Sequence, residues 1–190
     1  FLYLYQKVKD NKMLNRIYQP TNFAHQIVSR HISKGDICID ATAGRGNDTL
    51  FLSKLVGDFG RVYSLDIQKE AIENTKMLLE NNDLLDNVEL ILDGHENMDK
   101  YVENESISCI MFNLGWLPKG AHRISTRFET TILAVKKSLE LLKKDGIISI
   151  LIYSGKDTGF QEREEVLKFL KTIESKFTVM LSEHINKPNN

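Results

Sequence analysis

The stretch ICIDATAGRGNDTLFLSKL, residues 37–55, places a short apolar run directly before a glycine-containing turn and a segment with helical spacing. Asp40 ends the apolar run, and Asp48 follows the two glycines of the turn. This order is typical of a strand–turn–helix unit in a parallel sheet. The stretch therefore predicts a ligand-binding turn with a carboxylate on each side.

The rest of the chain repeats the alternation of strand and helix. The predicted strands cover residues 37–41, 61–66, 88–93, 107–114, 146–153 and 177–185, and the predicted helices lie near 47–56, 68–82, 95–103, 127–143 and 160–174. Nearly continuous apolar strands that alternate with helices indicate a sheet buried on both faces. We therefore predict an α/β fold with a doubly wound, mostly parallel, Rossmann-like sheet.

The domain organisation is simple. No repeat or linker divides the 190 residues, so a single domain over 1–190 is expected. Residues 1–34 are interpreted as an N-terminal helical extension that Pro20 interrupts, with Thr21 or Asn22 capping a second helix.

Composition and charge narrow the function classes. With 42% hydrophobic and 27% charged residues the chain can bury one core, and a net charge of -1 argues against indiscriminate nucleic-acid binding. Basic residues nevertheless gather in 1–34 and 119–144, either as solvated helix faces or as phosphate contacts. Cys38 and Cys109 lie in apolar runs and predict buried thiols in a reducing cytoplasm. We expect neither a metal site nor a membrane span.

The glycine turn indicates the kind of cofactor. A dinucleotide fingerprint needs a third glycine where Thr49 stands, and a diphosphate between Asp40 and Asp48 would be repelled. S-adenosylmethionine has the opposite charge pattern, because its ammonium and sulfonium groups are cationic. The turn therefore favours S-adenosylmethionine, and a plain strand-to-helix connection remains the alternative.

Two further strands end in an acid. Asp66 can accept the ribose hydroxyls of a nucleoside, and Asp93, with Gly94 and His95, is placed for an adenine edge. Each acid alone is also a common turn or helix cap. The predicted cofactor-binding residues are Asp40, Ala41, Thr42, Gly44, Gly46, Asn47, Asp48, Thr49, Asp66, Ile67, Gln68, Asp93, Gly94, His95 and Asn113.

Four motifs together resemble a known family: IDATAGRGNDT (39–49), SLDIQ (64–68), LDGH (92–95) and FNLGWLPKG (112–120). They resemble the class I S-adenosylmethionine-dependent methyltransferases, and specifically the tRNA (5-aminomethyl-2-thiouridine) methyltransferases once described as rRNA methylases. The resemblance runs from His25 to Asn190. It implies N-methylation of the aminomethyl group at the wobble uridine, with the tRNA anticodon stem-loop as partner.

The predicted catalytic residues are Asn113, Leu114 and Gly115. An amine attacks a methyl group only with a free lone pair, so the site must favour the neutral amine by excluding water and offering acceptors. Asn113 offers a side-chain carbonyl, and the two residues after it offer backbone carbonyls. No side chain is expected to be an obligatory base, and a turn cap remains the alternative role of Asn113.

The predicted substrate residues are Trp116, Lys119, Arg123, Arg127 and Tyr153. Trp116 offers a stacking surface for a splayed base or else fills the core, and the cations are suited to phosphates. The family has an acid where His122 stands and a histidine where Lys156 stands, so no role is carried over to those two residues.

The ends of the chain give two more expectations. His25 matches a histidine of the family and is expected beside the cofactor or the tRNA, or else inside a helix. The family continues beyond the proline of NKPNN with another strand, so the sequence is interpreted as trimmed. An edge of the sheet is then exposed or covered by another chain, as in a homodimer.

Two other functions are weighed against this one. The fold and cofactor do not fix the acceptor, so methylation of another RNA, such as rRNA, or of a small amine is the second hypothesis. A noncatalytic RNA-binding or cofactor-sensing module is the third.

Overall fold

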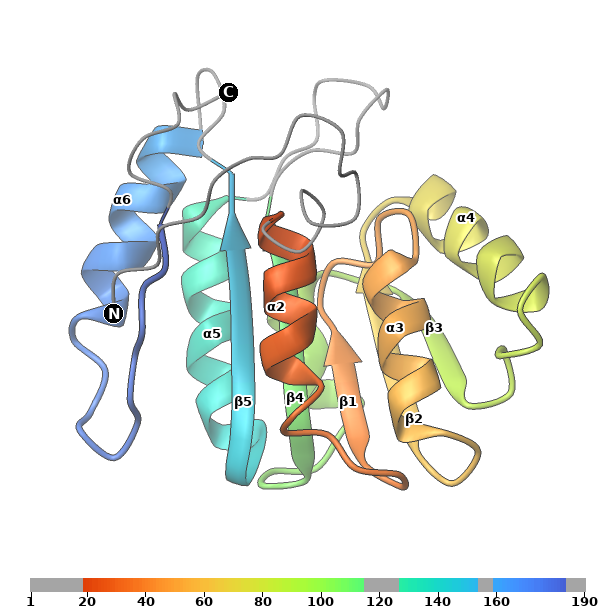
Figure 1. Ribbon diagram of the computed structural model, residues 1–190. Coiled ribbons are helices and arrows are strands. Elements are labelled where there is room, and N and C mark those ends of the chain that lie inside the picture. The colour runs from red at the N-terminus through yellow and green to blue at the C-terminus, as the bar shows by residue number, and fades with distance from the viewer. Residues whose placement is uncertain (1–18, 115–126, 154–158, 184–190) are drawn as a thin grey trace, which may run out of the picture.

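A computed structural model describes residues 19–114, 127–153 and 159–183, and it contains one parallel sheet (Figure 1). The five strands are β1 (Ile37–Asp40), β2 (Arg61–Asp66), β3 (Val88–Leu92), β4 (Ile107–Leu114) and β5 (Leu142–Ile152). Their order is β3-β2-β1-β4-β5. The direction of winding reverses at β1, so the switch point, where α/β proteins bind ligands, lies between β1 and β4. The predicted doubly wound parallel sheet is confirmed.

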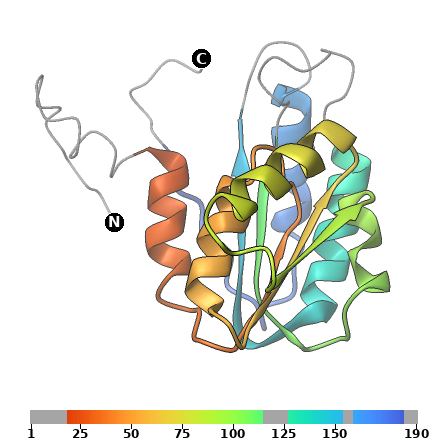
Figure 2. The same cartoon turned by 90° about the vertical axis from the view of Figure 1, so that its right-hand side faces the viewer.

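Helices cover both faces of the sheet (Figures 1 and 2). One face carries α2 (Pro20–Val28), α3 (Asn47–Val56) and α4 (Lys69–Glu80), and the other carries the 3₁₀ helix η1 (His95–Lys100), α5 (Phe128–Leu141) and α6 (Gly159–Leu170). An apolar cluster fills each interface, with Leu52 and Val28 in the first and Met98 and Phe112 in the second. The two-sided burial explains why the strands are apolar without alternation. None of the helices in these ranges is long and apolar enough to cross a membrane.

The central strands bury both cysteines side by side. Cys38 of β1 is in register with Cys109 of β4, and both are free thiols with no exposed surface. Burial raises the pKa of the Cys38 thiol to about 12, so this thiol stays protonated. The prediction that these cysteines are small buried residues is confirmed.

The predicted strand at 177–185 is wrong for the part that the structure describes. Residues 177–183 pair with no strand, and β5 is the edge of the described sheet. Met180 is 85% exposed and Leu181 is 65% exposed. A β-prone sequence forms a strand only where it gains ladder hydrogen bonds and a packing surface, and this segment has neither.

Several helix boundaries also differ from the prediction. Pro20 is the first residue of α2, where a missing N–H costs nothing, and no side chain caps the helix at Gln19, so neither Thr21 nor Asn22 is the cap. The helical segment expected before Pro20 lies outside the described residues. The helix expected at 95–103 is the shorter η1, and α5 ends at Leu141 because β5 begins at the next residue. The segment Asn47–Val56 is a helix as predicted.

The turn between β1 and α3 requires glycine at position 46. Gly46 has a φ of +80°, and a Cβ there would lie 2.9 Å from the Cα of Thr75. The positive φ disfavours any L side chain, and the short distance means that a Cβ would clash with the backbone of α4. The turn is therefore pressed directly against α4.

We expect Gly46→Ala to lower the free energy of unfolding by about 2–4 kcal/mol, because left-handed strain and overpacking act together. Urea denaturation followed by circular dichroism measures the loss.

Gly35→Ala is the matched control. Gly35 has a φ of +88°, but a Cβ there would meet no other atom within 4 Å, so only the strain of about 1–2 kcal/mol applies. Equal losses in the two variants would contradict the packing argument.

Candidate functional site

Asp40, the last residue of β1, is completely buried beneath the glycine turn. Its Oδ1 accepts the N–H of Thr42 at 3.1 Å, and its Oδ2 accepts the hydroxyl of Thr49 at 2.5 Å. The same Thr49 hydroxyl is hydrogen-bonded to Ser64 Oγ of β2, at 2.8 Å. Both carboxylate oxygens are thus used inside the protein, so Asp40 shapes the turn and supplies charge to it.

Ser64 was not among the predicted site residues. Its small polar side chain in the mostly apolar run RVYSLD is the signal that could have indicated it, since a buried polar side chain needs a partner.

The pKa of Asp40 is raised to about 7 by burial and, after that, by the negative charge of Asp48. Asp66 acts in the same direction. Three carboxyl groups therefore surround the turn, and a cation bound there would relieve their mutual repulsion.

The turn is tied to β4 by its threonine. The N–H of Asn113 donates to Thr42 Oγ1 at 2.8 Å, and the N–H of Ala41 donates to the carbonyl of Met111 at 2.8 Å. These bonds join the exits of β1 and β4 at the switch point. Asn113 and the glycine turn therefore lie next to each other at the switch point.

A second group of side chains lies where α2 meets α3. His25 Nε2 is 2.5 Å from Asp48 Oδ1, and the amide nitrogen of Asn113 is 3.3 Å from Asp48 Oδ2. The side chain of Asp48 is 6% exposed. Asp48 thus connects α2 to the end of β4, and Asn47 before it begins α3.

Asp66 stands at the exit of β2. Its Oδ2 accepts the N–H of Gly44 at 3.0 Å, and its Oδ1 accepts the N–H of Gln68 at 2.9 Å. Each oxygen has a further lone pair, so the half-buried carboxylate can still accept hydroxyls. Ile67 beside it is 58% exposed and offers an apolar surface at the same edge.

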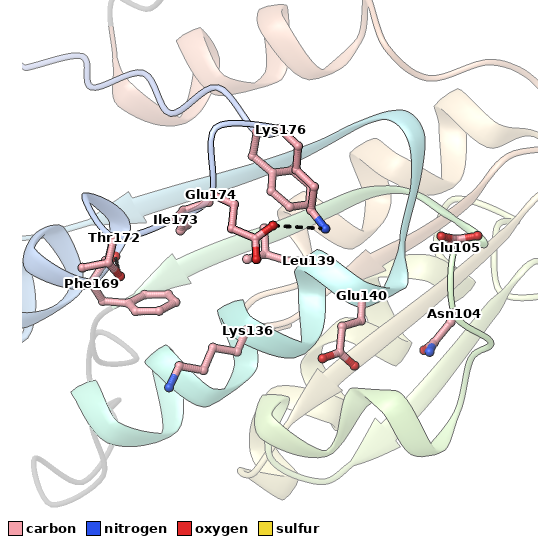
Figure 3. A pocket seen from close by; sticks show the side chains of 11 residues that line it. Asn104, Glu105, Lys136, Leu139, Glu140, Phe169, Thr172, Ile173, Glu174 and Lys176 are labelled. Atoms are coloured by element: carbon pink, nitrogen blue, oxygen red, sulfur yellow. Dashed lines mark hydrogen bonds and ion pairs between the residues drawn. The ribbon is translucent and has the colours of Figure 1, made fainter.

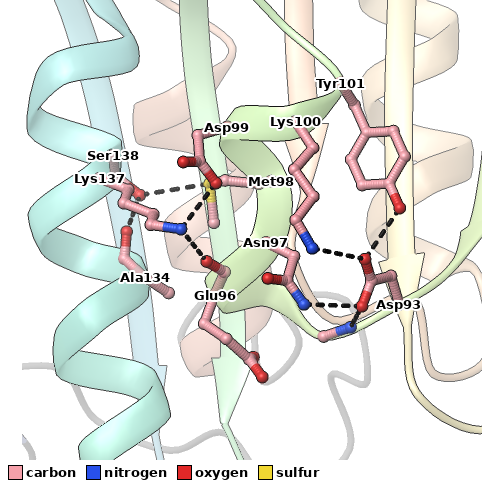
Figure 4. A network of polar contacts seen from close by, with 11 residues as sticks. Asp93, Glu96, Asn97, Met98, Asp99, Lys100, Tyr101, Ala134, Lys137 and Ser138 are labelled. Carbon is pink, nitrogen blue, oxygen red and sulfur yellow. Dashed lines mark hydrogen bonds and ion pairs between the residues drawn. The ribbon is translucent and has the colours of Figure 1, made fainter.

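Asp93 is bound within its own turn (Figure 4). Its carboxylate accepts bonds from the N–H of Gly94, the amide of Asn97 and the hydroxyl of Tyr101, at 2.7–2.8 Å. Lys100 lies 4.0 Å away. These bonds lower the pKa of Asp93 despite burial, and they fix η1 after β3. These contacts are typical of a carboxylate that precedes and stabilises the start of a helix. The predicted role of Asp93 in cofactor binding therefore stays a prediction.

His95 opens η1 and is 8% exposed. Its ring packs edge-on against Phe112 with a centroid distance of 5.8 Å. Burial lowers its pKa, so the imidazole is neutral. Within the described part of the chain, Nε2 has no hydrogen-bond partner. A buried polar atom without a partner is costly, and a ligand at this edge would satisfy it.

The predicted catalytic and substrate residues are placed in part. Leu114 is buried at the end of β4, Arg127 is exposed at the start of α5, and the hydroxyl of Tyr153 lies 3.4 Å from Thr21 Oγ1 on α2. Four predicted residues lie outside the described ranges: Gly115, Trp116, Lys119 and Arg123. His122 and Lys156 lie outside them as well.

A hollow lies at the opposite end of the sheet (Figure 3). It has a volume of about 630 Å³, and its walls come from the loop before β4, from the C-terminal parts of α5 and α6, and from residues 172–177 after α6. Lys136 and Lys176 face it together with Glu140 and Glu174. Its mixed charge and its place away from the glycine turn separate it from the candidate site. In residues 19–114, 127–153 and 159–183, no group of three potential ligands could hold a metal ion.

The parallel order β3-β2-β1-β4-β5 matches the fold of the class I methyltransferases, and similar solved structures support this assignment. A family profile described as "Putative rRNA methylase" matches residues 62–190, and the chain belongs to that family.

Individual relatives agree with this assignment. A crystal structure from Clostridium thermocellum, described as a "putative rRNA-methylase", is 49% identical with a TM-score of 0.88, covering 91% of this chain and 93% of that one. A crystal structure from Streptococcus mutans in complex with SAH, described as a "putative methyltransferase", is 40% identical with a TM-score of 0.82, covering 91% of this chain and 93% of that one.

A curated relative carries a more specific name. The chloroplastic tRNA (mnm(5)s(2)U34)-methyltransferase of Arabidopsis thaliana is 41% identical over 158 residues, which are 78% of this chain. The match covers 58% of the length of that relative.

The buried carboxyl group of Asp40 should make stability depend on pH. Its folded pKa of about 7 lies above the ordinary value of 3.8, so the folded state holds the proton more tightly. Stability therefore falls as pH rises through this window. We expect Asp40→Asn, relative to the unchanged protein, to gain about 2 kcal/mol of unfolding free energy between pH 5 and pH 8.

Chemical denaturation at the two pH values measures this gain. Asp58→Asn is the control, because it removes a carboxyl group from the exposed surface and leaves the buried one in place. A constant difference between Asp40→Asn and the unchanged protein at both pH values would refute the assignment.

Proposed function

We propose that the chain is an S-adenosylmethionine-dependent N-methyltransferase that methylates the aminomethyl group of 5-aminomethyl-2-thiouridine at the tRNA wobble position. The observation that carries the proposal is the placement of Asn113 at the switch point, beside a glycine turn surrounded by carboxylates. This arrangement suits a cationic cofactor and an amine acceptor at neighbouring positions.

The residues present fit S-adenosylmethionine, which supplies a methyl group activated by a sulfonium. Asp40, Asp48 and Asp66 provide negative charge at the turn. Asp66 has lone pairs left for ribose hydroxyls, and the unpartnered Nε2 of His95 can take a polar edge of the base.

The acceptor side favours a neutral amine. The amino group of Asn113 is directed at Asp48 Oδ2, so its carbonyl oxygen is left as an acceptor at the end of β4. A carbonyl there can hold one N–H of the amine while the lone pair points at the methyl group. The released proton can then leave to water, so no side-chain base is required.

Two observations support an RNA acceptor, and the first of them favours tRNA. The relative from Arabidopsis thaliana is named for the wobble uridine, whereas the family description names rRNA. Arg127 is exposed at the start of α5, on the same edge as the site, where it can contact phosphate of the anticodon stem-loop. A cytoplasmic location is part of the proposal, with the two buried free thiols as support.

The proposal is tested with tRNA that carries 5-aminomethyl-2-thiouridine, incubated with the protein and S-adenosylmethionine. Nucleoside mass spectrometry should detect the gain of one methyl group. Asn113→Ala should lower the rate at least about 100-fold, because it removes a polar contact to the reacting amine.

Asn82→Ala is the matched control, since Asn82 is exposed just after α4 and should keep the full rate. If the protein methylates an rRNA or a small amine and forms no product from this tRNA, the proposed substrate is wrong and the other acceptor takes its place. Cofactor binding without turnover on any amine would favour the noncatalytic hypothesis.

The tRNA contact is tested separately by the salt dependence of binding. Arg127→Gln should weaken tRNA affinity and reduce the slope of log K against log salt by about one, because one phosphate contact releases about one counterion.

Lys171→Gln is the charge-matched control. Lys171 is exposed beyond the C-terminal end of α6, at the opposite edge of the sheet, and its loss should leave the slope unchanged. An identical slope in Arg127→Gln and the unchanged protein would remove Arg127 from the RNA contact.

A further inference from the structure

We propose that His25 is a positioning residue: it fixes the carboxylate of Asp48, which in turn orients the side-chain amide of Asn113 toward the reacting amine. This inference rests on the proposed function, because it assigns a role within the same site. It gives helix α2 a role at the edge of the sheet that carries the proposed site.

The position of His25 is set by the packing of α2. Ala24 and Val28, four residues apart, are 7% and 0% exposed on the face of the helix that lies against the domain. His25 follows the first of them and is directed at α3. Its ring stacks on Phe51 with a centroid distance of 3.8 Å and an angle of 4°. The stack fixes the plane of the imidazole.

The contact between His25 and Asp48 has a defined direction. A carboxylate oxygen only accepts, so the imidazole donates its Nε2–H to Asp48 Oδ1 across 2.5 Å. The side chain of His25 is 20% exposed and that of Asp48 is 6% exposed, so water screens the pair weakly. One oxygen of Asp48 is thereby held.

The other oxygen of Asp48 decides how Asn113 is turned. Asp48 Oδ2 accepts the amide N–H of Asn113 at 3.3 Å, and a carbonyl in that place would face a carboxylate and be repelled. The carbonyl oxygen of Asn113 must therefore point away from Asp48. Without His25, the Asp48 carboxylate could rotate, and this preference would weaken.

The backbone of Asn113 does not fix the orientation of its side chain. The N–H of Asn113 is bound to Thr42 Oγ1, which fixes the end of β4 but leaves rotation of the side-chain amide open. If the side-chain amide of Asn113 turned over, its N–H groups would face the substrate amine in place of the carbonyl acceptor. His25 and Asp48 thus select the productive orientation.

His25→Ala should lower kcat about 10–100-fold while KM for tRNA and the Kd for S-adenosylmethionine change less than about threefold, because orientation in the transition state is lost and binding is not. His25→Gln can still donate an N–H to Asp48 and should recover most of the lost rate. His31→Ala is the control, since His31 is exposed just beyond the same helix.

A second measurement does not depend on turnover. The side-chain amide signals of Asn113 in ¹⁵N-labelled protein, assigned with Asn113→Ala, should shift in His25→Ala and stay in place in His25→Gln and His31→Ala. Shifted signals in a protein that does not methylate the proposed tRNA would refute the proposed substrate and support the positioning role.

Three results would overturn the inference. They are unchanged Asn113 signals in His25→Ala, a kcat loss that His25→Gln does not recover, and a defect that disappears at saturating S-adenosylmethionine. The last result would make His25 a cofactor-binding residue.

Discussion

The rest of the site depends on one buried carboxyl group, that of Asp40. It lies at the end of β1 without exposed surface, and it accepts bonds from Thr42 and Thr49 on the two sides of the glycine turn. These bonds close the turn over the carboxyl group, and Thr42 then binds the backbone of β4. The exits of the two central strands are held together through this group.

The same arrangement stores electrostatic energy at the site. Burial and the charge of Asp48 disfavour ionised Asp40, and Asp66 adds to the repulsion. A protein selected only for stability would not gather three carboxyl groups there. Their combination suits a cationic ligand, which turns repulsion in the free protein into attraction in the complex.

The two faces of the sheet contribute different parts of the site. The face with α2 and α3 supplies the polar chain from His25 through Asp48 to Asn113. The face with η1 supplies His95, an apolar-packed neutral imidazole whose Nε2 is left for a ligand. The side chains from the two faces meet at the carboxyl edge of the sheet. At the switch point the connections after neighbouring strands run to opposite faces, which leaves room for a ligand between them.

The sequence by itself determined the parallel α/β sheet, the glycine turn and the acids at the strand exits, because these follow from local periodicity and turn chemistry. Only the tertiary structure decided what each acid does: Asp93 serves its own turn, whereas Asp48 joins His25 to Asn113. It also decided that residues 177–183 form no strand. The spacing of residues along the chain determines the helix or strand to which a side chain belongs. The contacts of Asp48 with His25 and Asn113 join segments that are far apart in the sequence, so they form only when the elements pack together.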